Sequence, residues 1–440
     1  MKIMKFGGTS VGKPERMYEV AKLITKDAEA KIVVLSALSG TTNSLVEISN
    51  SLASGDRNLA KQQIENLQAH YQNFIGQLVK TEAAVTSAKN IVTEHFEFLN
   101  IILKISFSEA LNKDILAQGE LLSTKLFSVY LTEQGIDHAL IPALDFMAID
   151  SDDEPQVANI KAKLERVLLR LKDKTIFITQ GFICRNAKGE VDNLKRGGSD
   201  YSASLIAAAI NASVCEIWTD IDGMHNNDPR VVKKTFAIEQ MSFDEAAELA
   251  YFGAKILHPA SIWPAQFYKV PVKLLNTMQP DAKGTIITEE AGSVGVKAIA
   301  AKDGITAIKI KSSRMLLAYG FLRKIFEVFE KHRTSIDMIT TSEVGVSLTI
   351  DTDSHLPAII QELEPFGTVE IDADQTIVSI VGNEITETKD VMQQIFKSLS
   401  GVPIRMVSYG GSRHNISILI PKTYKLQTLQ LLNVGLFGLE

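Results

Sequence analysis

The chain has 440 residues and a formal net charge of −6, with 46 Lys and Arg against 52 Asp and Glu. That acidic balance argues against nucleic-acid binding as the main role, because phosphate contacts need clustered cations. No apolar run approaches the roughly 18 residues of a membrane span, so no membrane association is expected. Two cysteines, Cys184 and Cys215, are too few for a disulfide framework and form no CxxC zinc motif. We therefore expect a cytoplasmic protein of two or three domains.

The first half alternates short β-branched segments with longer helical patterns. Lys2–Phe6 and Lys31–Leu35 are expected strands, and Glu15–Asp27 between them carries apolar residues at helical spacing. This alternation predicts a parallel sheet covered by helices. The same order of strand, helix and strand recurs at Thr175–Thr179, Tyr201–Ala212 and Cys215–Trp218.

Residues 57–135 have a different composition. They are rich in Gln, Glu, Lys and Leu and poor in Gly and Pro, which predicts helices that flank the sheet or form a lid on it. The composition changes again near Pro280–Gly295, where glycines recur within a short stretch. A domain boundary is expected there.

An internal repeat follows that boundary. An expected helix, strand and helix around Phe326, Val346 and 355–363 recur around Phe396, Ile416 and the residues after Tyr424. Positions 326 and 396, and positions 346 and 416, are each 70 apart. Two copies of a small unit that packs helices on a sheet are therefore predicted.

The strongest local signal is the end of the first strand, Lys5-Phe6-Gly7-Gly8. Glycines let the backbone approach an anion there, and the amides of the following helix point toward it. The segment Gly7–Lys13 also matches GxxxxGK of a P-loop, but Pro14 stands where Ser or Thr would hold magnesium, so we disfavour a P-loop. The alternative without a ligand is a tight turn between strand and helix.

A second glycine pair, Gly197-Gly198, follows Arg196 and precedes another expected helix. Ser199 as the N-cap and Asp200 as a first-turn acid would account for two residues without any ligand. Two Gly-Gly loops, each beside a cation and each leading into a helix, instead predict two halves of one polyphosphate site. A dinucleotide fold is disfavoured, because no two glycines are spaced i, i+2 and GxGxxG cannot occur.

A third cluster follows the expected strand 215–218, where ligands bind in open α/β sheets. Its Asp222-Gly223 and Asp228-Pro229 pairs are common turn formers. Asp220 and Arg230 remain as candidate nucleotide contacts.

In combination, seven motifs resemble those of the aspartokinases, in the family's order and spacing over roughly the first 290 residues. The tail resembles the paired ACT domains of the same family, and the chain is too short for the homoserine dehydrogenase module of its bifunctional members. The motifs are KFGGTSVG at the start, SALSGTTN at Ser36–Asn43, QGELLST at Gln118–Thr124, KRGGSDYSA at Lys195–Ala203, EIWTDIDG at Glu216–Gly223, NDPRVV at Asn227–Val232 and FGAKILHP at Phe252–Pro259.

The resemblance implies an α/β fold. An amino-acid-kinase-like domain of three layers with a mainly parallel central sheet would span 1–290. Two α+β domains of the ACT type, with ferredoxin-like βαββαβ topology, would follow at 296–372 and 373–440. The second of these could take its first strand from about 296–302. A homodimer formed through the ACT domains, or a tetramer, is also implied.

The implied activity is phosphorylation of the β-carboxylate of L-aspartate by ATP, with Mg²⁺, to give 4-phospho-L-aspartate. This is the first step of lysine, threonine and methionine biosynthesis. The carboxylate is already ionised at neutral pH, since its reference pKa is near 3.9, so the nucleophile needs no general base. Catalysis should then depend on positioning and on neutralising the charge of the triphosphate.

The resemblance also assigns roles to residues, and none of them is a metal ligand. Lys5 and Asp200 would lie at the catalytic centre, with Glu120 meeting the amino group of aspartate and Arg196 a carboxylate. His225 stands where relatives often have Tyr. The substrate set is Ser36, Thr42, Glu120, Arg196 and Ser199, and the nucleotide set is Lys5, Gly7, Gly8, Thr219, Asp220, His225, Arg230 and Lys255.

The segment 335–344 resembles a lysine-binding effector segment, which implies L-lysine as a feedback inhibitor. Asp337 and Glu343 would hold the cationic amino acid; the alternative is that both are solvated loop acids. Ala318 and Tyr319 replace polar residues frequent in lysine-responsive relatives, so inhibition could be weaker or the effector different. The implied effector set is Met315, Phe321, Leu322, Asp337, Thr341, Ser342 and Glu343.

Two other functions stay open from the residues. One is a kinase of the same fold for glutamate, carbamate or a nucleotide; the QGELLST segment and the ACT-like tail argue against it. The other is a catalytically inactive amino-acid sensor, and the presence of Lys5, Arg196, Asp200 and Lys255 argues against that.

Overall fold

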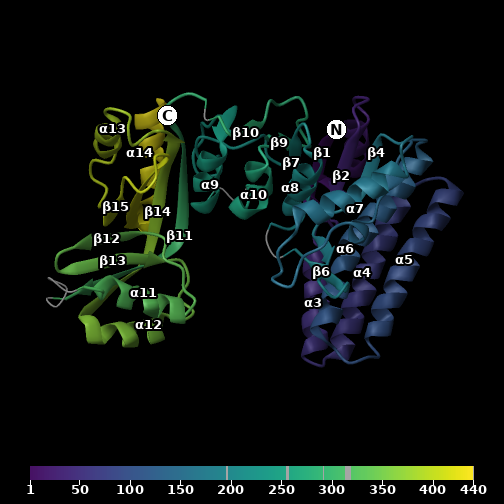
Figure 1. Cartoon of the computed structure of the whole chain (residues 1–440), viewed down its shortest axis with the longest axis horizontal. Helices are drawn as coiled ribbons and strands as arrows, with labels where there is room; N and C mark the ends of the chain where they lie inside the picture. Colours follow the sequence, from purple (N-terminus) through teal and green to yellow (C-terminus); the bar gives the residue numbers. More distant parts are fainter. Residues whose placement is uncertain (195–196, 254–256, 291, 313–318, 440) are drawn as a thin grey trace. The chain divides into compact units, whose positions relative to one another are not determined.

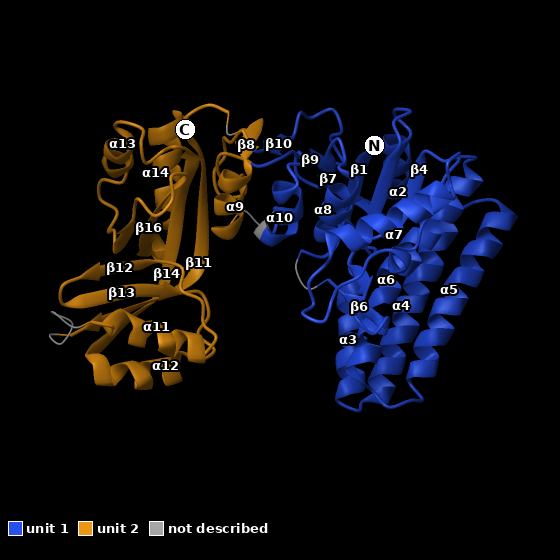
Figure 2. Ribbon diagram, in the orientation of Figure 1, with its two compact units in different colours: residues 1–224, 257–289 blue, residues 225–256, 290–440 orange. Residues whose placement is uncertain are grey.

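A computed structural model describes residues 1–194, 197–253, 257–290, 292–312 and 319–439. The chain forms two compact units, one made of residues 1–224 and 257–289 and the other of residues 225–256 and 290–440 (Figure 2). Three predicted site residues, Arg196, Lys255 and Met315, lie outside the described residues, as does Ala318.

Unit 1 is built on a mainly parallel sheet, as predicted (Figure 1). Its strands are short runs of Val, Ile, Leu and Phe that are buried on both faces, as expected for a sheet with helices on each side. The register places Phe6 of β1 beside Leu35 of β2 and Trp218 of β7, so these three strands end at one edge. The parallel strands run in the order β4 (Ile176–Gln180), β2 (Lys31–Leu35), β1 (Lys2–Phe6), β7 (Cys215–Thr219) and β9 (Val272–Asn276), with the short β3 (Ala139–Leu140) parallel beside β4 and β10 (Thr285–Thr288) antiparallel beside β9.

Helices cover both faces of this sheet. On one face, helical side chains share a single hydrophobic core with Met4, Phe6 and Val33 of the strands. Residues 57–135 therefore flank the sheet, which was one of the two predicted alternatives. The helices of this core are the short α1 (Gly8–Val11), α2 (Pro14–Ile24), α3 (Thr41–Ala53), α4 (Arg57–Leu78), α5 (Glu82–Ile102) and α6 (Glu109–Glu133). The others are α7 (Val157–Leu169), α8 (Gly198–Ile210), which packs on β1, and α10 (Pro259–Phe267).

Unit 2 contains an antiparallel sheet with two separate helix-covered cores, as the repeat predicted. The strand order is β12 (Ile339–Ser342), β13 (Gly345–Ile350), β11 (Gly295–Lys311), β14 (Thr368–Asn383), β16 (Asn415–Pro421) and β15 (Met406–Ser408). One core lies under α11 (Phe321–Lys331) and α12 (Leu356–Leu363), and the other under α13 (Val391–Ser398) and α14 (Lys425–Phe437).

The two halves of unit 2 share their central strands. Residues 306–311 of β11 pair with β13 of the first half, whereas residues 298–302 pair with the part of β14 that also pairs with β16. A second ACT-like domain that takes its first strand from about 296–302 stays a prediction. The boundaries 1–290, 296–372 and 373–440 stay predictions. Unit 2 also contains residues 225–256, with β8 (Gln240–Ser242) and α9 (Phe243–Tyr251), which the sequence placed in the first domain.

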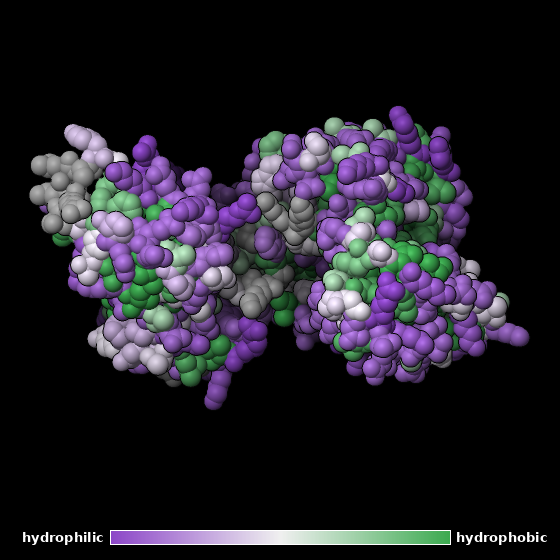
Figure 3. All heavy atoms as spheres, turned by 90° about the horizontal axis from the view of Figure 1, so that it is seen from below, coloured by the Kyte–Doolittle hydropathy of each residue, from purple (hydrophilic) through white to green (hydrophobic). Residues whose placement is uncertain are grey.

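On the face drawn in Figure 3, hydrophilic residues surround smaller hydrophobic patches. Within the described ranges, no helix combines the length and the apolar character needed to cross a membrane.

Candidate active site

The end of β1 holds an ion pair whose lysine is buried. The Lys5 ammonium lies 2.7 Å from Oδ1 of Asp200, which stands in the first turn of α8. A Cβ atom on Gly7 would lie 3.2 Å from Nζ of Lys5, so glycine keeps that side of the ammonium uncrowded. The sequence predicted both residues at the catalytic centre, and the fold places them in contact.

A cleft of about 330 Å³ lies at the edge where β1 and β2 end. Gly8 and Gly198 both line it, so the structure brings the two predicted Gly-Gly loops to one cleft. The N-cap of α8 is Gly197, with φ of 62°, and a Cβ there would lie 2.4 Å from Cβ of Ser261. The alternative in which Ser199 caps the helix is therefore wrong, because α8 begins one residue before it.

Three hydroxyl residues predicted to bind aspartate line the same cleft, namely Ser36, Thr42 and Ser199. The Ser36 hydroxyl donates to Oγ of Ser199 at 2.9 Å, joining the end of β2 to the start of α8. A Cβ on Gly181 would lie 2.3 Å from that of Ser199, so the turn after β4 approaches α8 only as glycine.

Glu120 of α6 is the buried acid of the cleft, with 4% of its surface exposed. Its Oε1 accepts from the Ala37 amide at 3.2 Å, and its Oε2 has no hydrogen-bond partner among the described residues. Burial raises the pKa of the Glu120 carboxyl to about 8. A buried carboxyl with an oxygen left over is suited to a cationic ligand group.

The predicted nucleotide residues fall in both units. Thr219 and Asp220 follow β7 in unit 1, where the Thr219 hydroxyl donates to Asp220 at 3.2 Å, and neither lines the cleft. In unit 2, His225 lies 2.9 Å from the Thr235 hydroxyl through Nδ1, and Arg230 forms a bidentate pair with Asp228 at 2.9 and 2.7 Å.

The predicted effector residues of unit 2 do not share one environment. Phe321 packs into the core of the first half, and Leu322 beside it is partly exposed. Thr341, Ser342 and Glu343 are exposed at the end of β12.

Asp337, by contrast, has a fully buried side chain, so the alternative of a solvated loop acid is wrong for it. Its Oδ1 accepts from the Tyr251 hydroxyl at 2.8 Å and lies 3.0 Å from the Lys302 ammonium. Lys302 also pairs with Asp351 at 2.8 Å. The chain thus supplies its own cation to the carboxylate that the sequence assigned to the effector.

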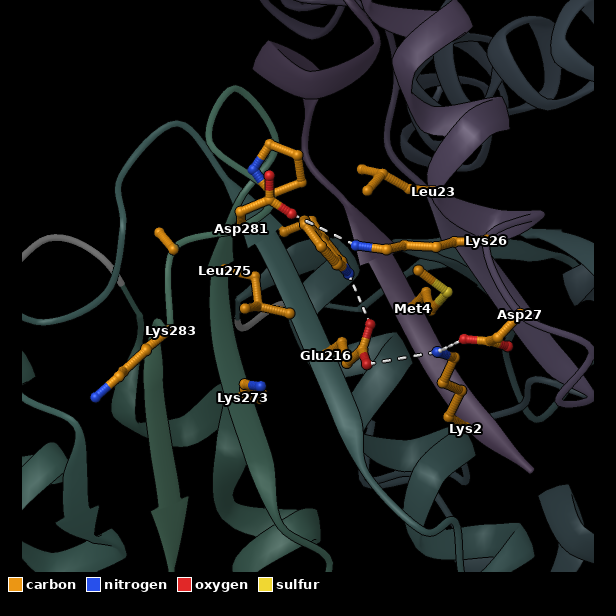
Figure 4. A pocket seen from close by; sticks show the side chains of 13 residues that line it. Lys2, Met4, Leu23, Lys26, Asp27, Glu216, Lys273, Leu275, Asp281 and Lys283 are labelled. Atoms are coloured by element: carbon orange, nitrogen blue, oxygen red, sulfur yellow. Dashed lines mark hydrogen bonds and ion pairs between the residues drawn. The ribbon is translucent and has the colours of Figure 1, made fainter.

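A larger depression of about 380 Å³ lies away from the cleft, between α2 and the face of β1 that carries Lys2 and Met4 (Figure 4). It is rich in charge, and five of its charged groups pair with one another: Lys2 points to Asp27 and Glu216, and Lys26 to Asp281. Hydrogen bonds from Lys2 and Lys31 hold the pKa of Asp27 well below its usual value. None of the predicted site residues lines this depression.

One feature of the site was missed by sequence reasoning. Phe182 lines the cleft with φ of 66°, and its amide donates to the Ser202 hydroxyl at 2.8 Å. The position of Gly181-Phe182 directly after a buried strand was the available signal. Among the described residues, no cluster of three or more His, Cys, Asp or Glu side chains is placed to hold a metal ion.

Comparisons with known proteins agree with this architecture. The amino acid kinase family model matches residues 1–276, and an ACT domain model matches residues 378–435. The chain is 34% identical over 453 residues to lysine-sensitive aspartokinase 3 of Escherichia coli (strain K12), covering 99% of each protein.

Two solved structures of E. coli aspartokinase III are similar over the whole chain. The complex with aspartate and ADP superposes with a TM-score of 0.82 at 34% identity, covering 99% of this chain and 100% of that one. The complex with lysine and aspartate gives a TM-score of 0.82 at 33% identity and covers 99% of both chains. As the seven motifs predicted, this chain belongs to the aspartokinase family and is a kinase with a carboxyl group as phosphoryl acceptor.

Proposed function

We propose that this protein transfers the γ-phosphoryl group of ATP to the β-carboxylate of L-aspartate in the cleft that Gly8, Gly198 and Glu120 line. The observation that carries the proposal is the convergence of both Gly-Gly loops with a buried carboxyl in one cleft, next to the Lys5–Asp200 pair. The product, 4-phospho-L-aspartate, is the entry to lysine, threonine and methionine biosynthesis.

The residues of the cleft suit the two ends of the acceptor. Oε2 of Glu120, without a partner among the described residues, can receive the amino group of aspartate. The hydroxyls of Ser36, Thr42 and Ser199 can donate to its carboxylates. Arg196, adjacent in sequence to Gly197, is proposed to grip a carboxylate in bidentate fashion.

The difficulty of the reaction is electrostatic, because an anion attacks a highly charged triphosphate. The Lys5 ammonium, held by Asp200 at 2.7 Å, is placed to meet the transferring phosphoryl group, and Gly7 leaves room for it. Asp200 orients this lysine and is not needed as a base. Thr219, Asp220, His225, Arg230 and Lys255 are proposed to contact the remainder of the nucleotide.

Mg²⁺ is proposed to enter with ATP and to offset phosphate charge. Hard carboxylate oxygens suit this ion, which usually takes one or two carboxylates together with phosphates and water. Asp200 and Asp220 are the acidic residues that fit, since Asp200 pairs with Lys5 from the first turn of α8 and Asp220 follows β7, the strand beside β1.

The test is an ADP-release assay with L-aspartate, L-glutamate or no acceptor, and with hydroxylamine to trap an acyl phosphate as the hydroxamate. The proposal predicts ADP release and a β-hydroxamate with aspartate only. Turnover with glutamate would favour the other amino-acid kinases, and no turnover with any acceptor would favour the inactive sensor.

L-Lysine is the proposed effector, acting on a homodimer joined through the ACT-like halves, with a tetramer as the alternative. The E. coli relative crystallised with lysine and the similarity over the full chain support it. Because Lys302 already pairs with Asp337, lysine must displace it or bind through Glu343, Thr341 and Ser342. A cytoplasmic location is also proposed, since Cys184 and Cys215 are both free and buried.

A further inference from the structure

The loop from His225 to Ala237, which carries Arg230, belongs to unit 2 and not to unit 1, which contains the parallel sheet. An antiparallel bridge joins His225 to Ala237 and closes the loop. Val232 packs in the same hydrophobic core as Leu429 and Leu432 of α14. Helix α14 therefore packs against this loop, whose residues His225 and Arg230 the sequence predicted to contact the nucleotide.

One buried side chain on α14 joins the two ends of this loop. Asn433 is completely buried, and its Oδ1 accepts from Nδ2 of Asn226 at 3.2 Å and from Nδ2 of Asn227 at 3.4 Å. Its Nδ2 donates to the carbonyl of Lys234 at 3.1 Å and to that of Leu439 at 3.1 Å. A side-chain amide can make four such bonds, and all four are formed here, three of them to the loop.

A short chain of hydrogen bonds connects Asn433 to the guanidinium of Arg230. Asn227, held by Asn433 and by the Leu429 carbonyl at 3.1 Å, accepts the Asp228 amide at 2.9 Å through Oδ1. Asp228 in turn accepts from the amide and from the guanidinium of Arg230. The Arg230 side chain remains 79% exposed, so it is oriented but open to a ligand.

We infer that Asn433 is a positioning residue for nucleotide binding, which acts through Asn227 and Asp228 to aim Arg230. The inference rests on the proposed function, because it takes Arg230 as a nucleotide contact. Its chemical reason is that a buried amide with every bond formed fixes its partners, and removing it leaves buried polar groups of the loop unsatisfied.

The experiment compares Asn433→Ser with Thr428→Val in the full-length protein. Thr428 is a matched control because it lies buried on the same helix and its hydroxyl has no partner among the described residues. Calorimetry with MgADP, without aspartate, should show binding weakened on the order of tenfold in Asn433→Ser, the loss of one charge-assisted contact. Thr428→Val should bind like the wild type.

Two further measurements separate positioning from a general loss of structure. The KM for ATP should rise in Asn433→Ser while the KM for aspartate changes by less than about twofold, since uniform damage would move both. Hydrogen exchange of residues 225–237 should accelerate in Asn433→Ser and stay unchanged in Thr428→Val. Asn227→Ser, which breaks the chain of hydrogen bonds from the loop side, should reproduce both effects and replaces Asn433→Ser if that variant does not fold.

The inference is overturned if wild type and Asn433→Ser bind MgADP equally, or if both KM values rise together. A wild type that binds no MgADP overturns the proposed function, and the inference with it. The inference is also contradicted if a variant binds ADP more weakly but shows unchanged hydrogen exchange at residues 225–237. The weaker binding would then not arise from a change in the loop.

Discussion

The two units each contain a pair of lysine and aspartate in which one partner is buried and the other is partly exposed, and the two pairs differ in their surroundings. In unit 1, Lys5 meets Asp200 at 2.7 Å, and Gly7 beside it has no side chain to crowd the ammonium. In unit 2, Lys302 is held by two carboxylates, those of Asp337 and Asp351, and its ammonium lies 4.5 Å from the centre of the Tyr251 ring. The same two residue types thus make a corner beside a glycine pair in one place and a cluster closed by a second carboxylate and an aromatic ring in the other.

The largest expected effect comes from removing the lysine of the pair in unit 1. Lys5→Ala should lower kcat by about 10³-fold, since preorganised charge at a transferring phosphoryl group contributes on that scale. The matched control is Lys13→Ala, because Lys13 is exposed at the N-cap of α2 and should matter little. Steady-state kinetics of both variants decide; equal losses would revive the P-loop interpretation.

A pH profile extends the comparison to Glu120, a buried carboxyl that accepts from the Ala37 amide and has no cation beside it among the described residues. Burial raises its pKa to about 8, so below that pH it is mostly the neutral acid. Binding the ammonium group of aspartate requires the ionised form, so the KM for aspartate should rise about tenfold for each pH unit below 8.

The control for this profile is Glu120→Gln, which keeps an acceptor for the Ala37 amide but cannot ionise. We expect a high KM that does not change between pH 6 and pH 8. A wild-type KM independent of pH over that range would show that Glu120 is not the group that meets the amino group.

Lys302→Met removes the cation that pairs with Asp337 and Asp351 in unit 2. Without its internal cation, Asp337 becomes available to an added ammonium, so half-inhibition should need about fivefold less L-lysine, at the low end of typical allosteric couplings. Lys302→Arg keeps the charge and serves as the control. An inhibition curve that is the same in wild type and Lys302→Met would mean that the effector does not use Asp337.

The smallest expected effect is on stability, from a hydrogen bond between the residues that follow β1 and β9. The Ser10 hydroxyl, buried after the Gly7-Gly8 corner, lies 2.7 Å from that of Thr277. Ser10→Ala should lower the free energy of unfolding by about 1–2 kcal/mol, since Thr277 is left without this partner. Denaturant unfolding measures it, and Ser54→Ala on the exposed end of α3 should change stability by less.

Local patterns predicted most elements, whereas contacts between distant residues decided what was missed. Lys2–Phe6 and Lys31–Leu35 are strands with the predicted bounds, because each is a short apolar run between polar turns. The helix predicted at 201–212 begins earlier, at Gly198, because two glycines with positive φ let α8 start inside the loop.

The repeat predicted two similar halves in the tail but not that β11 runs through both of them. A 70-residue spacing records corresponding positions and carries no information on which strands continue across the boundary. For the site, the motifs predicted that Lys5, Asp200, Ser36 and Glu120 act together. They could not predict that Lys302 neutralises Asp337, since that pairing depends on packing between segments 35 residues apart.

The central claim is that the two Gly-Gly corners and Lys5 receive the triphosphate while Glu120 holds the acceptor. The most direct measurement is a crystal structure with L-aspartate and a non-hydrolysable ATP analogue. We predict the terminal phosphate within hydrogen-bond distance of Lys5 and the Gly7-Gly8 amides, with the amino group of aspartate on Glu120. A terminal phosphate bound elsewhere, with both glycine corners vacant, would contradict the account.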